Sequence, residues 1–189
     1  MIAETPARVT NQKGFTLIDM LFVIALIGLL STFAIPGLMR ARGAAQSSSA
    51  VGTLRVVNSA QLSYAIVCGL GFYSPDFPTL ARKPAGALEG FLPPDLASGP
   101  TFIKSGYNFS LAGTGVAGSP ATCNGLPAGS AAPAYAVVAD HLDPVPIGRF
   151  FGSNADGVIY EHSLSLGAIM PEQGPPAAGA PLQRRRNRD

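Results

Sequence analysis

The strongest constraint on this chain is an apolar run close to its N-terminus. Between Phe15 and Ile35 the only ionisable side chain is that of Asp19. About 20 apolar residues are enough for a helix to cross roughly 30 Å of hydrocarbon, so this run can span a membrane. An acid inside such a span is costly and is more often functional than accidental. We therefore expect a membrane-spanning helix with a functional carboxylate near its start.

The junction before this run carries a resemblance to a known family. It reads Lys13-Gly14-Phe15-Thr16-Leu17-Ile18-Asp19 and resembles the class III signal of type IV pilins and type II secretion pseudopilins. The lysine places positive charge on the expected cytoplasmic side of the span. The resemblance implies that prepilin peptidase, a membrane enzyme, cuts after Gly14 and that the new amine of Phe15 is methylated. Such a cut keeps the apolar segment, whereas an ordinary secretory signal loses it.

The resemblance also implies assembly through the apolar helix. Subunits of this family pack these helices into a filament, in which the acid at the position of Asp19 pairs with the amine of a neighbour's first residue. Pairing offsets part of the cost of holding two charges at low dielectric. The family's usual acid is Glu, and the shorter Asp19 leaves a minor-subunit role open. Gly28 and Pro36 match a glycine and a proline common in pilins, and Pro36 is expected to bend or loosen the helix.

A second helical pattern follows the proline. Together, Phe15 to about Val67 are expected to form one helix of roughly 80 Å at 1.5 Å per residue, ended by Gly69 and Gly71. A 3.6-residue wheel groups one stripe that we expect to lie against the sheet. Its members are Val51, Leu54, Asn58, Leu62 and Ala65, with Ile66 at the edge.

Strand patterns appear only in the second half of the chain. Residues 107–111 alternate apolar with polar side chains, residues 134–139 form a second run, and residues 149–151 and 158–160 flank an Asp156-Gly157 turn signal. The last pair predicts a hairpin. The order of these motifs also resembles the sheet of pilin-like proteins, while residues 69–99 correspond to the variable connection between helix and sheet.

The fold class follows from these elements together with composition. Charged residues make up only 13% of the chain, which holds 22 glycines and 17 prolines, so a sheet with many loops is favoured over a helical bundle. We expect an α+β fold with a long N-terminal helix on a small antiparallel sheet, which the resemblance implies is pilin-like. The predicted segments are a leader (1–14), a transmembrane and polymerisation helix (15–36), its amphipathic half (37–67), a globular β-sheet domain (68–169) and a disordered basic tail (170–189).

The two cysteines predict a bridge outside the cytoplasm. An oxidising compartment permits a disulfide between Cys68 and Cys123, which would close a loop of about 55 residues worth on the order of 4 kcal/mol. Two independent buried thiols are the alternative. A zinc site is not expected with two histidines and no C-x-x-C.

No clustering of catalytic residues is found, which favours a structural protein over an enzyme. The chain has no G-x-S-x-G, no H-E-x-x-H and no phosphate-binding glycine loop, and no cofactor is expected. His141 is interpreted as part of a solvated turn. Asp140, Asp143 and Asp156 are too few for a calcium site, which needs six or more oxygens.

We therefore expect a structural subunit of a type IV pilus-like filament. Its partners would be further copies of itself, prepilin peptidase, the membrane and a pilus or secretion assembly platform. The subunit would cross the inner membrane once and then enter a periplasmic or surface filament. The alternatives are a type II secretion pseudopilin and an anchored binding domain or enzyme that never polymerises. Contact with a polyanion is a further option, through Arg184, Arg185, Arg186 and Arg188.

Overall fold

The computed structural model describes residues 14–96, 99–143 and 149–182. The chain divides into two units, Met1–Arg42 and Gly43–Asp189. Three helical elements are present in the described residues: α1 (Leu17–Val67), the short α2 (Phe77–Ala81) and the 3₁₀ helix η1 (Pro94–Leu96). The strands are β1 (Thr101–Lys104), β2 (Tyr107–Ala112), β3 (Ala136–His141), β4 (Phe150–Asn154), β5 (Ile159–His162) and β6 (Ala180–Pro181). The expected α+β class is confirmed, with a long N-terminal helix and an antiparallel sheet.

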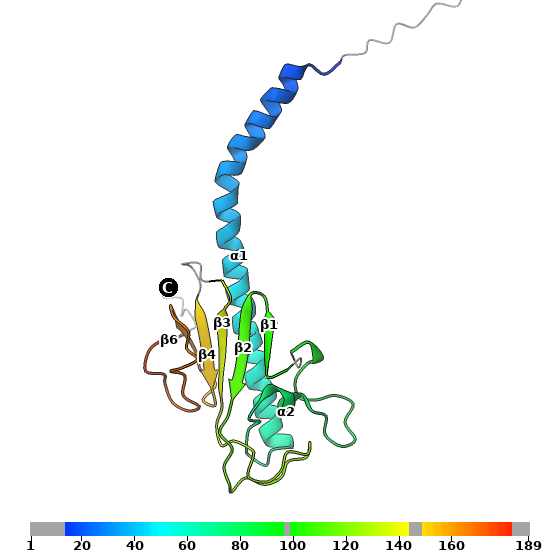
Figure 1. Cartoon of the computed structure of the whole chain (residues 1–189), viewed down its shortest axis with the longest axis vertical. Helices are drawn as coiled ribbons and strands as arrows, with labels where there is room; N and C mark the ends of the chain where they lie inside the picture. Colours follow the sequence, from blue (N-terminus) through cyan, green and yellow to red (C-terminus); the bar gives the residue numbers. More distant parts are fainter. Residues whose placement is uncertain (1–13, 97–98, 144–148, 183–189) are drawn as a thin grey trace, which may run out of the picture. The chain divides into compact units, whose positions relative to one another are not determined.

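The sheet is an antiparallel meander in which neighbours in sequence are neighbours in space, in the order β1-β2-β3-β4-β5-β6 (Figure 1). The predicted strand at 107–111 is confirmed as β2, whose side chains alternate between buried and partly exposed. The predicted strand at 134–139 begins two residues later, as β3. The hairpin is confirmed, because β4 pairs with β5 and Gly157 takes a positive φ of 74° in the turn between them.

Strand β1 was missed by the sequence interpretation. Its four residues pair with β2 through a two-residue turn, Ser105-Gly106, in which both residues have positive φ. Two consecutive positive φ values are typical of the tight turns whose twist matches that of flanking strands. The Ser-Gly pair between two β-forming runs was the available signal.

The buried face of α1 in the second unit differs from the predicted one. The side chains that enter the core are those of Ala50, Leu54, Val57, Gln61 and Tyr64. They pack against the aromatic residues of the sheet, including Tyr107, Phe109 and Phe151. Leu62 and Ile66 are 55% and 72% exposed. Leu54 and Ala65 of the predicted stripe are buried, so the prediction is right in part, and the buried face is rotated from the predicted one by about 80° on the helical wheel.

The position of this face depends on buried polar groups that a hydrophobicity pattern treats as exposed. The side chain of Gln61 is fully buried. Its Nε2 donates to the backbone carbonyl of Ser74 at 2.9 Å, and its Oε1 accepts from the backbone N–H of Ser74, also at 2.9 Å. Both polar ends are thus satisfied, so the glutamine can lie in the core and fix the segment after α1 against the helix.

Replacing Gln61 with Leu is expected to lower the free energy of unfolding by about 2 kcal/mol. The change leaves one buried N–H and one buried carbonyl of Ser74 without partners, and each such group costs about 1–3 kcal/mol, offset in part by the apolar side chain. Urea unfolding of the full chain in detergent micelles measures the effect. Ser63→Ala, at an exposed position of the same helix, is the control and should change stability by less than about 0.5 kcal/mol. An equal loss in both variants would contradict the role assigned to Gln61.

The connection 69–99 holds more order than the sequence indicated. Asp76 caps α2 by accepting from the backbone N–H of Thr79 at 2.7 Å, and Pro78 lies in the first turn, where a missing N–H costs nothing. Phe77 is fully buried and covers the core. Tyr73 pairs with Ala132 in an isolated antiparallel bridge.

The prediction of a disordered tail from residue 170 onward is wrong for residues 170–182. Met170 is buried in a small cluster on the sheet. The amide of Asn154 donates to carbonyls of Pro171 and Gly174, and the backbone N–H of Leu182 donates to the carbonyl of Ile159. These bonds order a stretch whose Pro- and Gly-rich composition indicates disorder. Residues 183–189, with the four arginines of the predicted tail, lie outside the described residues.

Candidate functional site

The N-terminal turn of α1 holds a reciprocal cap built from Thr16 and Asp19. The hydroxyl of Thr16 accepts from the backbone N–H of Asp19 at 3.3 Å, and Asp19 Oδ2 accepts from the backbone N–H of Thr16 at 3.2 Å. The Thr16 hydroxyl also donates to the same carboxylate oxygen at 2.5 Å. This is a capping box, which satisfies backbone N–H groups that the first helical turn otherwise leaves unpaired. The carboxylate is thereby held beside the backbone N–H of the residue that follows Phe15.

The segment after this cap exposes its apolar side chains. The large hydrophobic residues between Phe15 and Ile35 are all exposed in the isolated chain, Phe15 itself by 76%. Within the described ranges, α1 is the one helix long and apolar enough to cross a membrane. Burial of so much apolar surface requires lipid or other protein chains. This part of the helix therefore needs an apolar environment that it does not find among the described residues.

Polar groups inside the apolar segment are satisfied within the helix. The hydroxyl of Ser31 donates to the carbonyl of Ile27 at 2.8 Å, and that of Thr32 donates to the carbonyl of Leu29 at 2.5 Å. The assigned helix continues through Pro36. A Cβ added at Gly28 would meet no atom within 4 Å, so this glycine leaves a gap on the helix surface rather than accommodating a contact in the same chain.

The predicted disulfide between Cys68 and Cys123 is confirmed, with 4.9 Å between the two Cα atoms. It joins the residue after α1 to the loop between β2 and β3. A backbone hydrogen bond from the N–H of Cys123 to the carbonyl of Cys68 lies beside it, at 3.3 Å. The bridge therefore ties the end of the helix to a loop distant in sequence.

Of the residues considered as metal ligands, His141 and Asp156 have other partners, whereas Asp140 Oδ1 is buried without a hydrogen-bond partner among the described residues. His141 Nδ1 lies in a turn with the backbone of Asp143, and Asp156 accepts from the backbone N–H of Gly174. In the part of the chain that the structure describes, no three His, Cys, Asp or Glu side chains are grouped closely enough for a metal.

Burial raises the pKa of Tyr64 and Tyr107. The hydroxyl of Tyr64 donates to Asn124 and that of Tyr107 donates to the carbonyl of Arg149, so both act as structural donors.

Several predicted site residues are placed and others are not. Gly14 and Phe15 lie exposed immediately before α1, and Asp19 lies in its first turn. Lys13 and most of the predicted leader lie outside the described residues, as do Arg184, Arg185, Arg186 and Arg188. The sequence interpretation missed the role of Thr16, although the T-x-x-D spacing before an apolar run was the available signal.

Comparison with known proteins includes a family model that matches this N-terminal part. Residues 9–35 match the family model described as the prokaryotic N-terminal methylation motif. The chain is 33% identical over 81 residues to the type IV major pilin protein PilE1 of Neisseria gonorrhoeae, covering 43% of this chain and 37% of that protein. It is 36% identical over 54 residues to the type IV major pilin protein PilA of Myxococcus xanthus (strain DK1622), covering 29% of this chain and 24% of that protein. The matched part is thus less than two fifths of either relative's length. No solved structure matches the chain.

Proposed function

We propose that this chain, whose N-terminal segment is of the type IV pilin kind, is a structural subunit of a type IV pilus-like filament. The observation that carries the proposal is the exposed, membrane-length apolar half of α1, which begins directly after the Gly14-Phe15 junction. Both relatives are named as major pilins, which favours a pilus over a secretion pseudopilin. The proposed role involves no reaction and no cofactor.

Cleavage is proposed to occur between Gly14 and Phe15. Gly14 has open space around its Cα and no side chain, and both residues are exposed, so an extended strand across this bond can enter a peptidase site. The new amine would lie one residue before the capping box. Asp19 would then be near its own chain's ammonium before assembly, and a neighbour's ammonium could take that place in a filament.

The subunit is proposed to be held first in the inner membrane by α1 and to enter a filament on the far side. The confirmed disulfide agrees with a globular unit outside the cytoplasm, because thiols in the cytosol are kept reduced. In the filament, the apolar side chains between Phe15 and Ile35 would pack against those of other copies. Lipid thus covers the apolar side chains in the membrane, and neighbouring copies cover them in the filament.

The proposal is tested by intact mass and N-terminal sequencing of the chain from its native membrane. A chain that begins at Phe15, with or without a methyl group, is expected. Filaments on intact cells would then place the subunit in a surface pilus, whereas filaments confined to the periplasm would indicate a secretion pseudopilin. A chain still carrying Gly14, in cells whose other pilins are processed, would overturn the proposal.

Replacing Gly14 with Val is expected to block this processing. A β-branched side chain next to the scissile bond obstructs a site shaped for glycine, so the mature fraction should fall by at least about tenfold, equivalent to about 1.4 kcal/mol in the activation barrier. Mass spectrometry of membrane fractions measures both forms. Gly37→Val is the matched control, since Gly37 also has open space around it but lies far from the junction in sequence. Normal maturation of the Gly14 variant would contradict the assigned cleavage site.

A further inference from the structure

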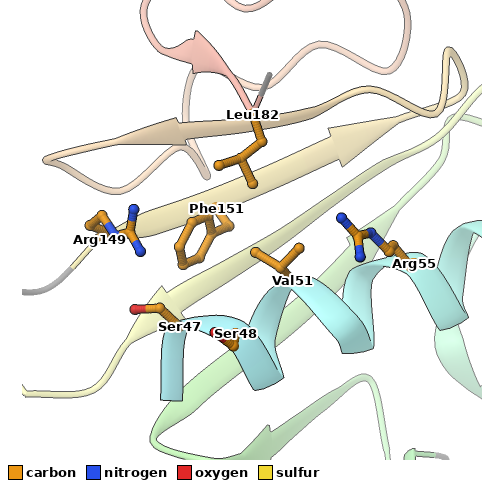
Figure 2. Close-up of a pocket in the computed structure, with 7 residues that line it drawn as sticks. All are labelled: Ser47, Ser48, Val51, Arg55, Arg149, Phe151 and Leu182. Carbon is orange, nitrogen blue, oxygen red and sulfur yellow. The ribbon is translucent and has the colours of Figure 1, made fainter. Parts of the chain in front are cut away.

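A pocket of about 420 Å³ lies in the second unit between α1 and the β4–β6 side of the sheet (Figure 2). Its lining combines two guanidinium groups with an apolar floor. The guanidinium groups are those of Arg55 on α1 and Arg149 just before β4, and the floor is formed by Val51, Phe151 and Leu182. Such a lining suits a ligand that presents an acid beside an aliphatic group.

The pocket carries an excess of positive charge. Arg149 forms an ion pair with Glu161 at 2.9 Å, and its guanidinium carbon lies 5.6 Å from the centre of the Phe151 ring. Arg55 is exposed and forms no hydrogen bond or ion pair with any residue that the structure describes. One carboxylate of the chain thus neutralises one of two cations, which leaves room for a second carboxylate from outside.

The second unit offers few carboxylates that could fill this place. Most of its described acids already accept a hydrogen bond or a salt bridge or are partly buried: Asp76, Asp95, Asp140, Asp156, Glu161 and Glu172. Lys104, for example, donates to Asp95 and holds the pKa of that carboxyl below its usual value. The two exposed acids whose carboxylates have no partner among the described residues are Glu89 and Asp143.

Among the described residues of the second unit, Glu89 lies beside the most exposed large hydrophobic side chain. Leu88 is 89% exposed, and every residue from 85 to 89 is exposed. The pair therefore presents an aliphatic group next to a carboxylate, which is the combination that the lining of the pocket suits. Docking would remove the exposed apolar surface of this leucine from water, which is energetically favourable.

The position of the loop distinguishes Glu89 from Asp143. Phe91, at the base of the loop that carries Glu89, packs edge-on against Tyr64 with 5.3 Å between ring centres. Tyr64 lies 13 residues beyond Val51 of the pocket, or about 20 Å along α1. The base of the acidic loop thus lies beside the later part of the helix segment that packs on the sheet. The pocket lies beside its earlier part, from Ser47 to Arg55, and Arg55 also borders the hollow that Phe91 lines.

Asp143, in contrast, lies at the pocket's own end. The backbone N–H of the preceding residue, Leu142, donates to the carbonyl of Gly106 at 3.0 Å, and a Cβ on Gly106 would meet the side chain of Gln46 at 2.9 Å. A contact between groups at the same end closes after two copies. A head-to-tail contact builds a filament wherever the rotation between copies does not close it into a ring.

We infer that Leu88 and Glu89 of one copy dock into the pocket of a second copy, where Glu89 pairs with Arg55 and Leu88 covers the apolar floor. This contact rests on the proposed filament and adds to it a head-to-tail link between globular units. It supplies specificity of stacking, because a charge pair that is partly removed from water discriminates strongly between partners.

Charge exchange in the full-length chain tests the contact on cells. Arg55→Glu and Glu89→Arg are each expected to lower the number of filaments about tenfold, and the double variant R55E/E89R is expected to recover most of them. Asp143→Arg, which makes the same charge change at an exposed acid, is the matched control and should leave filaments unchanged. Cleavage and protein level of each variant are measured by intact mass and immunoblot.

Cysteine cross-linking provides a second, independent test of the contact. The pair Ser48→Cys and Leu88→Cys is expected to produce a ladder of covalent oligomers on non-reducing gels, whereas either change alone produces none. The contact would be overturned by cross-linked dimers without a ladder or by an absence of cross-linking. It would also be overturned by single charge variants with normal filaments, or by a double variant as defective as the single ones. Absence of filaments from the unaltered chain would overturn the proposed function as well, so the two failures are distinguishable.

Discussion

Replacing both Cys68 and Cys123 with Ala is expected to lower the free energy of unfolding by about 4 kcal/mol. The bridge closes a loop of 55 residues, and loop-entropy arithmetic for that length gives about 4 kcal/mol at 25 °C. This loss is a large fraction of the 5–15 kcal/mol that typically holds a domain folded. The expected result is a marked fall in the urea midpoint of the full chain in detergent, followed by tyrosine fluorescence because the chain has no Trp.

Two comparisons isolate the bridge. Adding reductant should destabilise the unaltered chain by a similar amount and should leave the double variant unchanged. Ala is chosen because Cys68 is 3% exposed and a serine hydroxyl there would add a buried polar group. A loss below about 1 kcal/mol would show that the loop is already ordered in the unfolded chain, contrary to this account.

Replacing Asp19 with Ala is expected to reduce filaments more than about a hundredfold while leaving cleavage at Gly14 intact. In the proposed filament, loss of the carboxylate would leave the ammonium of Phe15 without a partner in the apolar bundle, and an unpaired buried charge costs about 3–5 kcal/mol. The helix also loses one arm of its capping box, worth about 1 kcal/mol. Electron microscopy of cell surfaces and intact mass of the membrane pool measure the two effects separately.

Two further variants separate assembly from capping. Asp19→Glu keeps the charge and should retain filaments, whereas Thr16→Ala removes the cap but keeps the carboxylate and should reduce filaments only slightly. Normal filaments in the Asp19→Ala variant would contradict the pairing role. Equal defects in the Thr16 and Asp19 variants would show that capping alone is required.

The elements that the sequence revealed are those with local signals. The apolar run after Gly14 shows the start of α1, and Asp156-Gly157 shows the hairpin of β4 and β5. β6 had no such signal, because Ala180 and Pro181 pair with β5 only through contacts distant in sequence. Proline in a sheet is confined to edges, so its presence indicated a loop instead.

The face of α1 shows a second limit of local patterns. A hydrophobic wheel selects Leu62 and leaves Gln61 outside, yet the structure buries the glutamine and exposes the leucine. The choice depends on Ser74, whose backbone groups meet the amide across 13 residues of sequence. Asp19 in the candidate site could be recognised by its isolation in an apolar run, whereas Arg55 and Arg149 line one pocket only because the fold places α1 beside β4.

The two edges of the sheet have a consequence for aggregation. β1 is only four residues long, and β6 is two residues long and ends in Pro181, which has no N–H to donate. Short edges and an edge proline are the usual protection against pairing with a strand of another molecule. Subunits stored at high local concentration would otherwise extend one another's sheets in an uncontrolled and hardly reversible way. The blunt edges of this sheet thus favour association through side chains, which permits an assembly to be taken apart again.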